Sequence, residues 1–427
     1  MDTIARESSP YSLAAWRSLD PVARQLIWVR LLRSIAQGAL AVDFTLYLRA
    51  RGWSASAVGL LLMAGGLAGA ALSLVVGVVS DRAGRRVFLI IYEAGLSLGT
   101  FAVIALPATW VLVLTAALFG FGRGANGSSG PFAPAEQAWL AQRVPDARRG
   151  PVFSLNAGMQ FAGMGLGSLL AAVLPHLLPG QRGAAAFLPL FALNLLVALV
   201  NLGQILRLRE EKPAHRVALP QPKSPDAASE SDLTRGENRA LVLLTLVNMV
   251  NSLGVGLVAP LLPYWFAVRF GAGPELIGPV YSLTFFLTGL SSLAVGRLSQ
   301  RIGLVRSIVL PRLAGVFLLT LIPFAPSFGL AAALYVARSI VNRGSVGARQ
   351  AFSVGLVRDR RRGLATSLNA VSWNVPAALG PALGGYLIDM GALFWPFLLA
   401  AVLQLGYVVL FPTVLGRYEQ RRAQAAD

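Results

Sequence analysis

The sequence contains no cysteine, and it has only two histidines, His176 and His215. Without thiols the chain forms no disulfides, thiolate metal sites or cysteine nucleophiles. Because both histidines fall in expected loops, a zinc or haem centre built from histidine is not expected. Charged residues are also scarce, at 13% of the 427 residues, where soluble domains carry about 25%. Since 55% of the residues are hydrophobic, a soluble protein with a single core is excluded.

The sequence also lacks the short motifs of membrane hydrolases and primary pumps. It contains no Gly-x-x-x-x-Gly-Lys-Ser/Thr phosphate loop, no His-Glu-x-x-His zinc motif and no Gly-x-Ser-x-Gly nucleophile motif. We therefore expect a protein that is not an enzyme and that uses no metal or cofactor. The energy for its work is expected to come from an ion gradient, with protons as the expected ion, or from the solute itself.

Long apolar stretches are abundant, and they mark twelve candidate membrane spans. A helical crossing needs about 20 apolar residues. The stretches are apolar around their whole circumference and do not alternate every second residue, which predicts helices. The expected spans run approximately over residues 26–48, 55–79, 87–107, 109–135, 151–174, 184–206, 240–268, 275–296, 304–325, 328–355, 364–388 and 392–415.

Basic residues are distributed unevenly between the two sides of these spans. Most of the 37 lysines and arginines lie in the two tails and the even-numbered connections. The opposite connections hold only Arg49, Arg51, Arg182 and Arg269. Because short basic loops stay on the cytoplasmic side, both termini are predicted to be cytoplasmic. The net charge of +18 then reflects orientation and attraction to anionic lipid headgroups, so no nucleic-acid partner is expected.

One long hydrophilic segment, residues 207–238, interrupts the apolar pattern. It is rich in proline, serine and charge, which is typical of a flexible linker. The predicted organisation has an N-terminal cytoplasmic tail, a six-helix bundle, this cytoplasmic linker, a second six-helix bundle and a C-terminal cytoplasmic tail. The corresponding residues are 1–25, 26–206, 207–238, 239–415 and 416–427.

The two predicted bundles share an internal repeat. Residues 148–150 and 154–157 (Arg-Arg-Gly and Ser-Leu-Asn-Ala) recur at an offset of 213 as residues 361–363 and 367–370. Around the connection between helices 2 and 3, a glycine, an arginine and a second glycine recur at an offset of 219. Two homologous bundles joined by a linker are suited to rocking about a shared site, which is the geometry of alternating access.

Residues 77–86, with the sequence Gly-Val-Val-Ser-Asp-Arg-Ala-Gly-Arg-Arg, carry a specific resemblance. They resemble the signature loop of the major facilitator superfamily, Gly-x-x-x-Asp-Arg-x-Gly-Arg-Arg/Lys, at its place between helices 2 and 3. Arg123 followed by Gly127 is similar to the second motif of that family, in helix 4. The likeness spans the whole chain and implies a twelve-helix secondary transporter.

The resemblance also implies a gate on the cytoplasmic side. In the family, the acid of the loop, here Asp81, pairs with the start of helix 11 and with the arginine four positions on. The alternative is that the charges of this loop only enforce topology. The predicted loop residues of the gate are Gly77, Asp81, Arg82, Gly84, Arg85 and Arg86.

The repeat predicts a further contact of this gate. Under the offset of 213, Glu136 in helix 4 corresponds to Arg349 in helix 10, so equivalent positions carry opposite charges. We expect Glu136 and Arg349 to meet when the cytoplasmic side closes.

Asp43 lies within helix 1, where an ionised carboxylate facing lipid costs at least about 2.5–3.5 kcal/mol. We therefore expect it to face a cavity or a partner, or to be protonated. Arg123 in helix 4 is the expected partner, although Asp43 lies on the order of 8 Å nearer the outside by helical rise. Protonation of Asp43 would release Arg123 and so couple a proton to transport. The alternative is a static structural pair.

Helix 10 carries the clearest polar stripe, because Arg338, Asn342, Ser345 and Arg349 share one helical face. Arginines on such a stripe are too costly for lipid exposure and are expected to line the central cavity. Arg30, Arg33 and Gln37 likewise share one face of helix 1. The alternative is that Arg30, Arg33 and Arg349 extend to the cytoplasmic headgroups. The predicted cavity residues are Arg33, Gln37, Arg338, Asn342, Ser345, Trp373 and Asn374.

This cavity is expected to be electropositive, because the helices offer few acids against these arginines. The acids of the helices that we consider as candidate counterions are Asp43, Glu93 and Glu136. An anionic substrate that bears a carboxylate or phosphate is therefore favoured.

Glycines recur at helical spacing in two of the expected helices. They are Gly158, Gly163, Gly165 and Gly167 in helix 5 and Gly380, Gly384 and Gly385 in helix 11. Small residues allow helix backbones to approach closely in a membrane, so these positions predict tight helix packing. The antiporter signature of the resembled family, Gly-Pro-x-x-Gly-Gly, belongs in helix 5, whereas here it occupies residues 380–385.

The leading functional hypothesis is proton-coupled export of a small organic solute or drug, anionic or amphipathic, by a monomer in the cell membrane. The expected partners are that small-molecule substrate and the lipid bilayer. Uptake of an organic anion by a symporter or facilitator is the second hypothesis. A membrane sensor or assembly factor that does not transport is the third.

Overall fold

The computed structural model describes residues 16–106, 108–122, 133–145, 148–178, 180–210, 227–302, 304–344 and 362–424. Within these ranges every regular element is helical, which confirms the prediction of an all-α protein. The first seven α-helices are α2 (Pro21–Ala50), α3 (Ala55–Ala83), α4 (Arg85–Ala105), α5 (Thr109–Phe119), α6 (Ala133–Gln142), α7 (Arg149–Ala171) and α8 (Leu188–Arg207). The others are α9 (Ala227–Val258), α10 (Leu262–Phe270), α11 (Pro274–Ile302), α12 (Leu304–Leu321), α13 (Phe328–Gly344), α15 (Arg362–Asp389) and α16 (Trp395–Gln424).

Several of these helices are long and apolar enough to cross a membrane. Among the described residues the segments of this kind are Ala55–Gly77, Arg85–Ala105, Arg149–His176, Gly183–Arg207, Arg235–Phe270, Ser307–Phe324 and Trp395–Thr413. Thr109–Phe119 and Phe328–Asn342 are shorter apolar helices. The chain is therefore a multi-pass membrane protein, while the count of twelve spans and the cytoplasmic termini stay predictions.

The expected span 240–268 is interrupted in the structure. A short 3-10 turn, Ala259–Leu261, separates α9 from α10. Pro260 lies in this turn and Pro263 in the first turn of α10. Because proline has no backbone N–H, it fits the first turn of a helix and breaks a helix interior, which explains the break.

The chain divides into two compact units, and the helices α3 and α11 each have one half in either unit. Unit 1 contains Met1–Tyr47, Ala71–Glu210 and Pro274–Gly289. Unit 2 contains Leu48–Ala70, Glu211–Gly273 and Leu290–Asp427. The first half of α3 thus belongs with α15 and α16, and the first half of α11 belongs with α7. The predicted bundle boundaries, 26–206 and 239–415, stay predictions.

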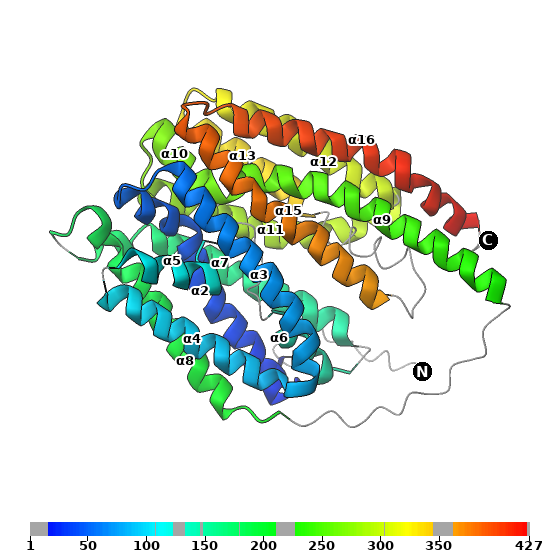
Figure 1. The fold of residues 1–427 in the computed structure, drawn as a ribbon, viewed down its shortest axis with the longest axis horizontal. Helices are drawn as coiled ribbons and strands as arrows, with labels where there is room; N and C mark the ends of the chain where they lie inside the picture. The colour runs from blue at the N-terminus through cyan, green and yellow to red at the C-terminus, as the bar shows by residue number, and fades with distance from the viewer. Residues whose placement is uncertain are drawn as a thin grey trace, which may run out of the picture. The chain divides into compact units, whose positions relative to one another are not determined.

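Glycines place pairs of helix backbones in direct contact within each unit. In unit 1, a Cβ added to Gly163 or Gly167 of α7 would strike the carbonyl oxygens of Leu31 and Ile35 in α2. In unit 2, a Cβ added to Gly384 of α15 would strike the Leu257 carbonyl oxygen in α9. The predicted tight packing of the glycines in these two helices is confirmed except at Gly158 of α7, where an added Cβ would meet nothing within 4 Å. Figure 1 shows α9, α15 and α16 packed side by side.

Candidate functional site

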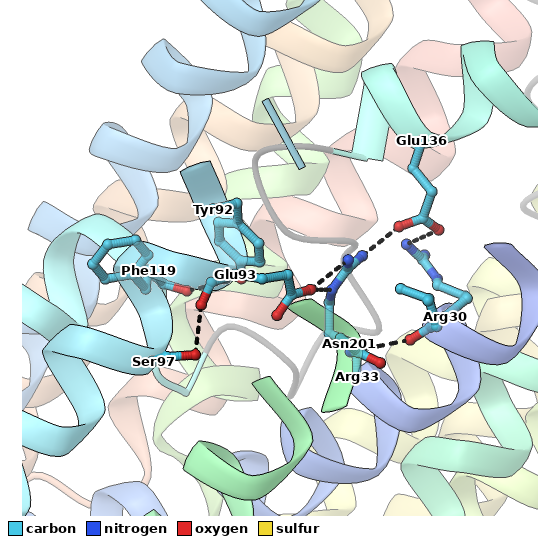
Figure 2. A network of polar contacts seen from close by, with 9 residues as sticks. Arg30, Arg33, Tyr92, Glu93, Ser97, Phe119, Glu136 and Asn201 are labelled. Carbon is cyan, nitrogen blue, oxygen red and sulfur yellow. Dashed lines mark hydrogen bonds and ion pairs between the residues drawn. The ribbon is translucent and has the colours of Figure 1, made fainter. Parts of the chain in front are cut away.

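Four charged side chains form a buried network in unit 1 (Figure 2). Arg30 and Arg33 lie three residues apart on one face of α2, Glu93 lies on α4 and Glu136 lies on α6. Each is at most 5% exposed. Two positive and two negative charges therefore share one site that water does not reach.

Arg33 is the centre of this network. Its Nε and Nη2 both donate to Oε1 of Glu93, at 2.9 and 2.6 Å, and its Nη1 donates to Oε2 of Glu136. The guanidinium carbon also lies 5.5 Å from the centroid of the Tyr92 ring. Arginine presents several donors in a planar fork, so one side chain can bridge two carboxylates.

Arg30 completes the network on the other side of Glu136. Its Nη1 donates to Oε1 of Glu136 at 3.5 Å, and its Nη2 donates to Oε1 of Gln160, on α7, at 2.6 Å. Asn201 of α8 donates to the Val29 carbonyl oxygen at 3.4 Å and so ties α8 to the same part of α2. Five helices of unit 1 are joined at this site.

The network changes two expectations from the sequence. Arg30 and Arg33 do not extend to the headgroups, because both side chains are buried against carboxylates. Glu136 binds both Arg30 and Arg33 and Glu93 binds Arg33, so two of the few candidate counterions balance the positive charge expected of this part of the cavity. A substrate contact by Arg33 stays a prediction. Arg349 lies outside the described residues, so the predicted pair of Glu136 and Arg349 also stays a prediction.

Asp43 lies nearly three turns beyond Arg33 along α2 and is fully buried. Neither of its carboxylate oxygens has a hydrogen-bond partner among the described residues. The charged group that acts electrostatically on Asp43 is Glu275, in the first turn of α11. Both carboxyl groups are negative when ionised, so they repel each other. The predicted partner Arg123 lies outside the described part of the chain.

Unit 2 holds a second buried polar cluster around α13. Arg338 is 7% exposed and its Nη2 donates to Oε1 of Gln404, on α16, at 3.3 Å. Asn342, one turn on, is also buried and lies against Gly315 of α12. Arg338 and Asn342 thus face the protein interior, while their place in a substrate cavity stays a prediction. The other stripe residue, Ser345, lies outside the described residues.

Two residues of this cluster were missed by the sequence argument. Gln404 is fully buried, and its Nε2 has no partner among the described residues. Arg312 of α12 is buried with its guanidinium carbon 5.9 Å from the centroid of the Tyr407 ring. A single polar residue inside an apolar helix gives no periodic signal. Of the other predicted cavity residues, Gln37, Trp373 and Asn374 are half-buried.

The segment that resembles the family signature, residues 77–86, runs from the end of α3 into the first turn of α4. Gly84 has φ 94°, a conformation that glycine adopts without strain, and a Cβ there would lie 3.2 Å from Glu210. Oε1 and Oε2 of Glu210 accept the backbone N–H groups of Arg85 and Arg86 at 2.9 and 2.8 Å. This carboxylate caps the start of α4, where the helix dipole favours negative charge.

The arginines of this loop also bind backbone carbonyls. Arg85 Nη1 donates to the Ala138 carbonyl oxygen at 2.9 Å, and Arg86 Nη2 donates to that of Leu206 at 2.7 Å. Gly77 of α3 lies beside Pro134 of α6. The side chains of Asp81 and Arg82 lie outside the described part of the structure, so the gate role of this loop stays a prediction.

Replacing Glu210 with alanine is expected to destabilise the start of α4. Two helix-capping hydrogen bonds and a favourable interaction with the helix dipole would be lost, which costs roughly 1–2 kcal/mol. The measurement is the free energy of unfolding in mixed detergent and dodecyl sulfate micelles. Arg209→Ala, which changes an exposed neighbour, is the matched control and should leave stability unchanged. Equal stability of both variants would contradict the cap.

Comparisons with known proteins agree with this architecture. The family model of the Major Facilitator Superfamily matches residues 26–241 and 244–426. An uncharacterised membrane protein of Saccharomyces cerevisiae is 24% identical over 333 residues, which cover 71% of this chain and 74% of that protein.

Solved structures of transporters share the fold. An inward-facing bacterial homologue of the human lysosomal transporter Spinster has a TM-score of 0.67 at 16% identity, over 96% of this chain and 98% of that one. The nucleoside transporter NupG has a TM-score of 0.69 at 12% identity, over 92% and 99%. A D-xylose–proton symporter has a TM-score of 0.66 at 12% identity, over 92% and 97%. The chain belongs to the Major Facilitator Superfamily, whose fold is that of membrane transporters.

Proposed function

We propose that this chain is a secondary active transporter that works by alternating access and exports a small organic solute across the cell membrane in exchange for protons. It acts as a monomer, with the proton gradient as its energy source and without a cofactor. The observation that carries this proposal is the buried carboxyl group of Asp43, which has no hydrogen-bond partner in the part of the chain that the structure describes.

Asp43 is suited to carry the coupled proton. An ionised carboxylate buried without hydrogen bonds is costly, so in this conformation the neutral acid is favoured. When Asp43 loses its proton, the new charge needs a partner or water, and it repels Glu275 in the first turn of α11. A proton on Asp43 therefore favours one arrangement of the helices and its loss favours another. Two such states are what a coupled carrier needs.

The polar cluster of unit 2 supplies the groups that would contact the solute. Arg338 offers a guanidinium to a carboxylate or phosphate. Asn251 of α9 and Gln404 both keep buried amide atoms without a partner among the described residues. Buried polar atoms of this kind call for water or a ligand. These side chains favour an anionic or amphipathic solute that also forms hydrogen bonds.

The test is flux in proteoliposomes with an imposed pH gradient. Carboxyfluorescein serves as an organic anion and ethidium as an amphipathic cation. Export by exchange predicts dye accumulation on the side from which protons leave. Accumulation on the side that protons enter would instead show a symporter, for which the buried arginine of α13 already offers an anion contact. Flux equal to that of protein-free liposomes for both dyes would contradict transport of these classes and favour a sensor.

A further inference from the structure

Asp389, the last residue of α15, binds the first turn of α3. Its Oδ1 accepts the backbone N–H of Ala55 and its Oδ2 accepts that of Ser56, both at 2.8 Å. The hydroxyl of Ser54 accepts the N–H of Ala57 at 3.2 Å. These three amides of the first turn of α3, which have no partner inside the helix, are therefore satisfied, two of them by a residue more than 330 positions away.

The same two helices touch along their length within unit 2. A Cβ added to Gly385 of α15 would strike the Ala55 carbonyl oxygen, and one added to Gly59 of α3 would strike that of Pro381. α10 holds both neighbouring loops, because Tyr264 donates to the Trp53 carbonyl oxygen at 3.2 Å and Trp265 donates to that of Leu393 at 3.0 Å. The contact is thus an extended helix crossing with a carboxylate cap at its end.

An equivalent crossing exists in unit 1, at the positions that the internal repeat predicts. Adding 219 to Gly59 gives Gly278 of α11, and subtracting 213 from Pro381 gives Ser168 of α7. A Cβ added to Gly278 would lie 2.6 Å from the Ser168 carbonyl oxygen. The pairs α3–α15 and α7–α11 are therefore two copies of one contact, each of which joins the first half of the sequence to the second.

The ends of the two crossings are also equivalent, but they differ in chemistry. The same offsets relate Asp389 to His176 and Ser56 to Glu275. His176 Nε2 lies 4.0 Å from Glu275 Oε2, and both side chains are more than half exposed. Such a surface pair contributes little, and it is ionic only when the histidine is protonated. The cap by Asp389 is the stronger of the two contacts.

We propose that the crossing of α3 and α15 closes the transport pathway at the end where α3 begins and α15 ends, and that Asp389 is its latch. In the closed state the carboxylate satisfies the α3 amides. Opening this end pulls α3 from α15 and breaks both hydrogen bonds of the Asp389 carboxylate. Asp389 therefore sets the equilibrium between closed and open states at this end. This inference rests on the proposed alternating access.

The latch stays engaged at neutral pH. Burial alone would raise the pKa of the Asp389 carboxyl, but hydrogen bonds from Ser56, Ala55 and Ser54 lower that pKa below its ordinary value. A lowered pKa means that the stabilisation is present above about pH 4 and is lost as the pH falls through the lowered value. Tyr264 and Arg49 are the other titratable or charged groups that influence this site.

The test uses the absence of native cysteine. Spin labels are attached to cysteines at Arg51 and Ala392, in the two loops of the α3–α15 crossing, and their distance distribution is measured in lipid nanodiscs. Asp389→Ala is expected to raise the ratio of long to short distances about fivefold. Asp389→Asn, which keeps one acceptor oxygen, should give a smaller rise. Glu210→Gln, which alters the carboxylate cap of α4, is the matched control and should leave the distribution unchanged.

A second variant changes the same helix crossing without altering the Asp389 carboxylate. Gly385→Ala forces α3 and α15 apart and is expected to lengthen the distances as well. An unchanged distribution in Asp389→Ala would overturn the latch, whatever the other variants do. Because the distances are read without solute or gradient, failure of the latch is distinguishable from failure of transport, which the dye flux reports separately.

Discussion

Replacing Glu136 with alanine is expected to reduce the free energy of unfolding by about 3–5 kcal/mol, because it removes a carboxylate that balances the charge of two buried arginines. Glu136 accepts hydrogen bonds from both Arg30 and Arg33, and all three side chains are at most 5% exposed. Glu93 would remain as the only carboxylate bound to this arginine pair among the described residues. The measurement is unfolding in mixed detergent and dodecyl sulfate micelles.

A double-mutant cycle separates this mechanism from simple loss of packing. If the cost arises from an uncompensated charge, Arg30→Ala in the Glu136→Ala background should recover part of the lost stability. Arg30→Ala alone should be destabilising, since it leaves Glu136 with excess negative charge in the site. Costs that add for the two substitutions would show that the charges are not coupled, and would contradict the network as the source of stability.

Replacing Asp43 with asparagine is expected to abolish accumulation driven by a pH gradient while leaving the fold intact. Asparagine has nearly the same shape as the neutral acid but cannot release a proton, so the two protonation states that drive the exchange no longer exist. Gradient-driven dye accumulation should fall to the level of protein-free liposomes. Exchange of dye across the membrane without a gradient should persist, because binding and rocking need no proton in this variant.

Thr45→Val is the matched control for Asp43→Asn. Thr45 is also buried on α2, and its hydroxyl has no hydrogen-bond partner among the described residues, but it cannot ionise at physiological pH. Its replacement should leave coupling unchanged. If Asp43→Asn retains accumulation equal to that of the unaltered protein, Asp43 is not the coupling group and the argument from its burial is wrong.

The sequence predicted the features that depend on a single helix. Apolar stretches located the helices, and helical spacing placed Arg338 and Asn342 on one face of a helix, which is buried in the structure. Apart from Gly158, the glycines of α7 and α15 were correctly predicted as packing positions, because a missing side chain has the same effect against any neighbour. The repeat relates the two glycine crossings, since equivalent positions in the two halves make equivalent contacts.

Contacts between distant helices were not predictable in this way. The spacing of Arg30 and Arg33 placed them on one face, but the rotation of α4 and α6 decides that Glu93 and Glu136 meet that face. A single sequence carries no signal for such rotations. The caps made by Glu210 and Asp389 join residues 125 and 334 positions apart. The sequence does not distinguish such a capping acid from an acid that faces solvent at a helix end.

In the proposed function, solute movement and proton movement are obligatorily linked through Asp43. The most direct test records both fluxes in the same proteoliposomes, with the dye that gives flux outside and a pH-sensitive dye enclosed in the lumen. The inward-directed solute gradient should drive protons out of the lumen, and Asp43→Asn should abolish this proton movement. Solute flux without any change of luminal pH in the unaltered protein would contradict the account.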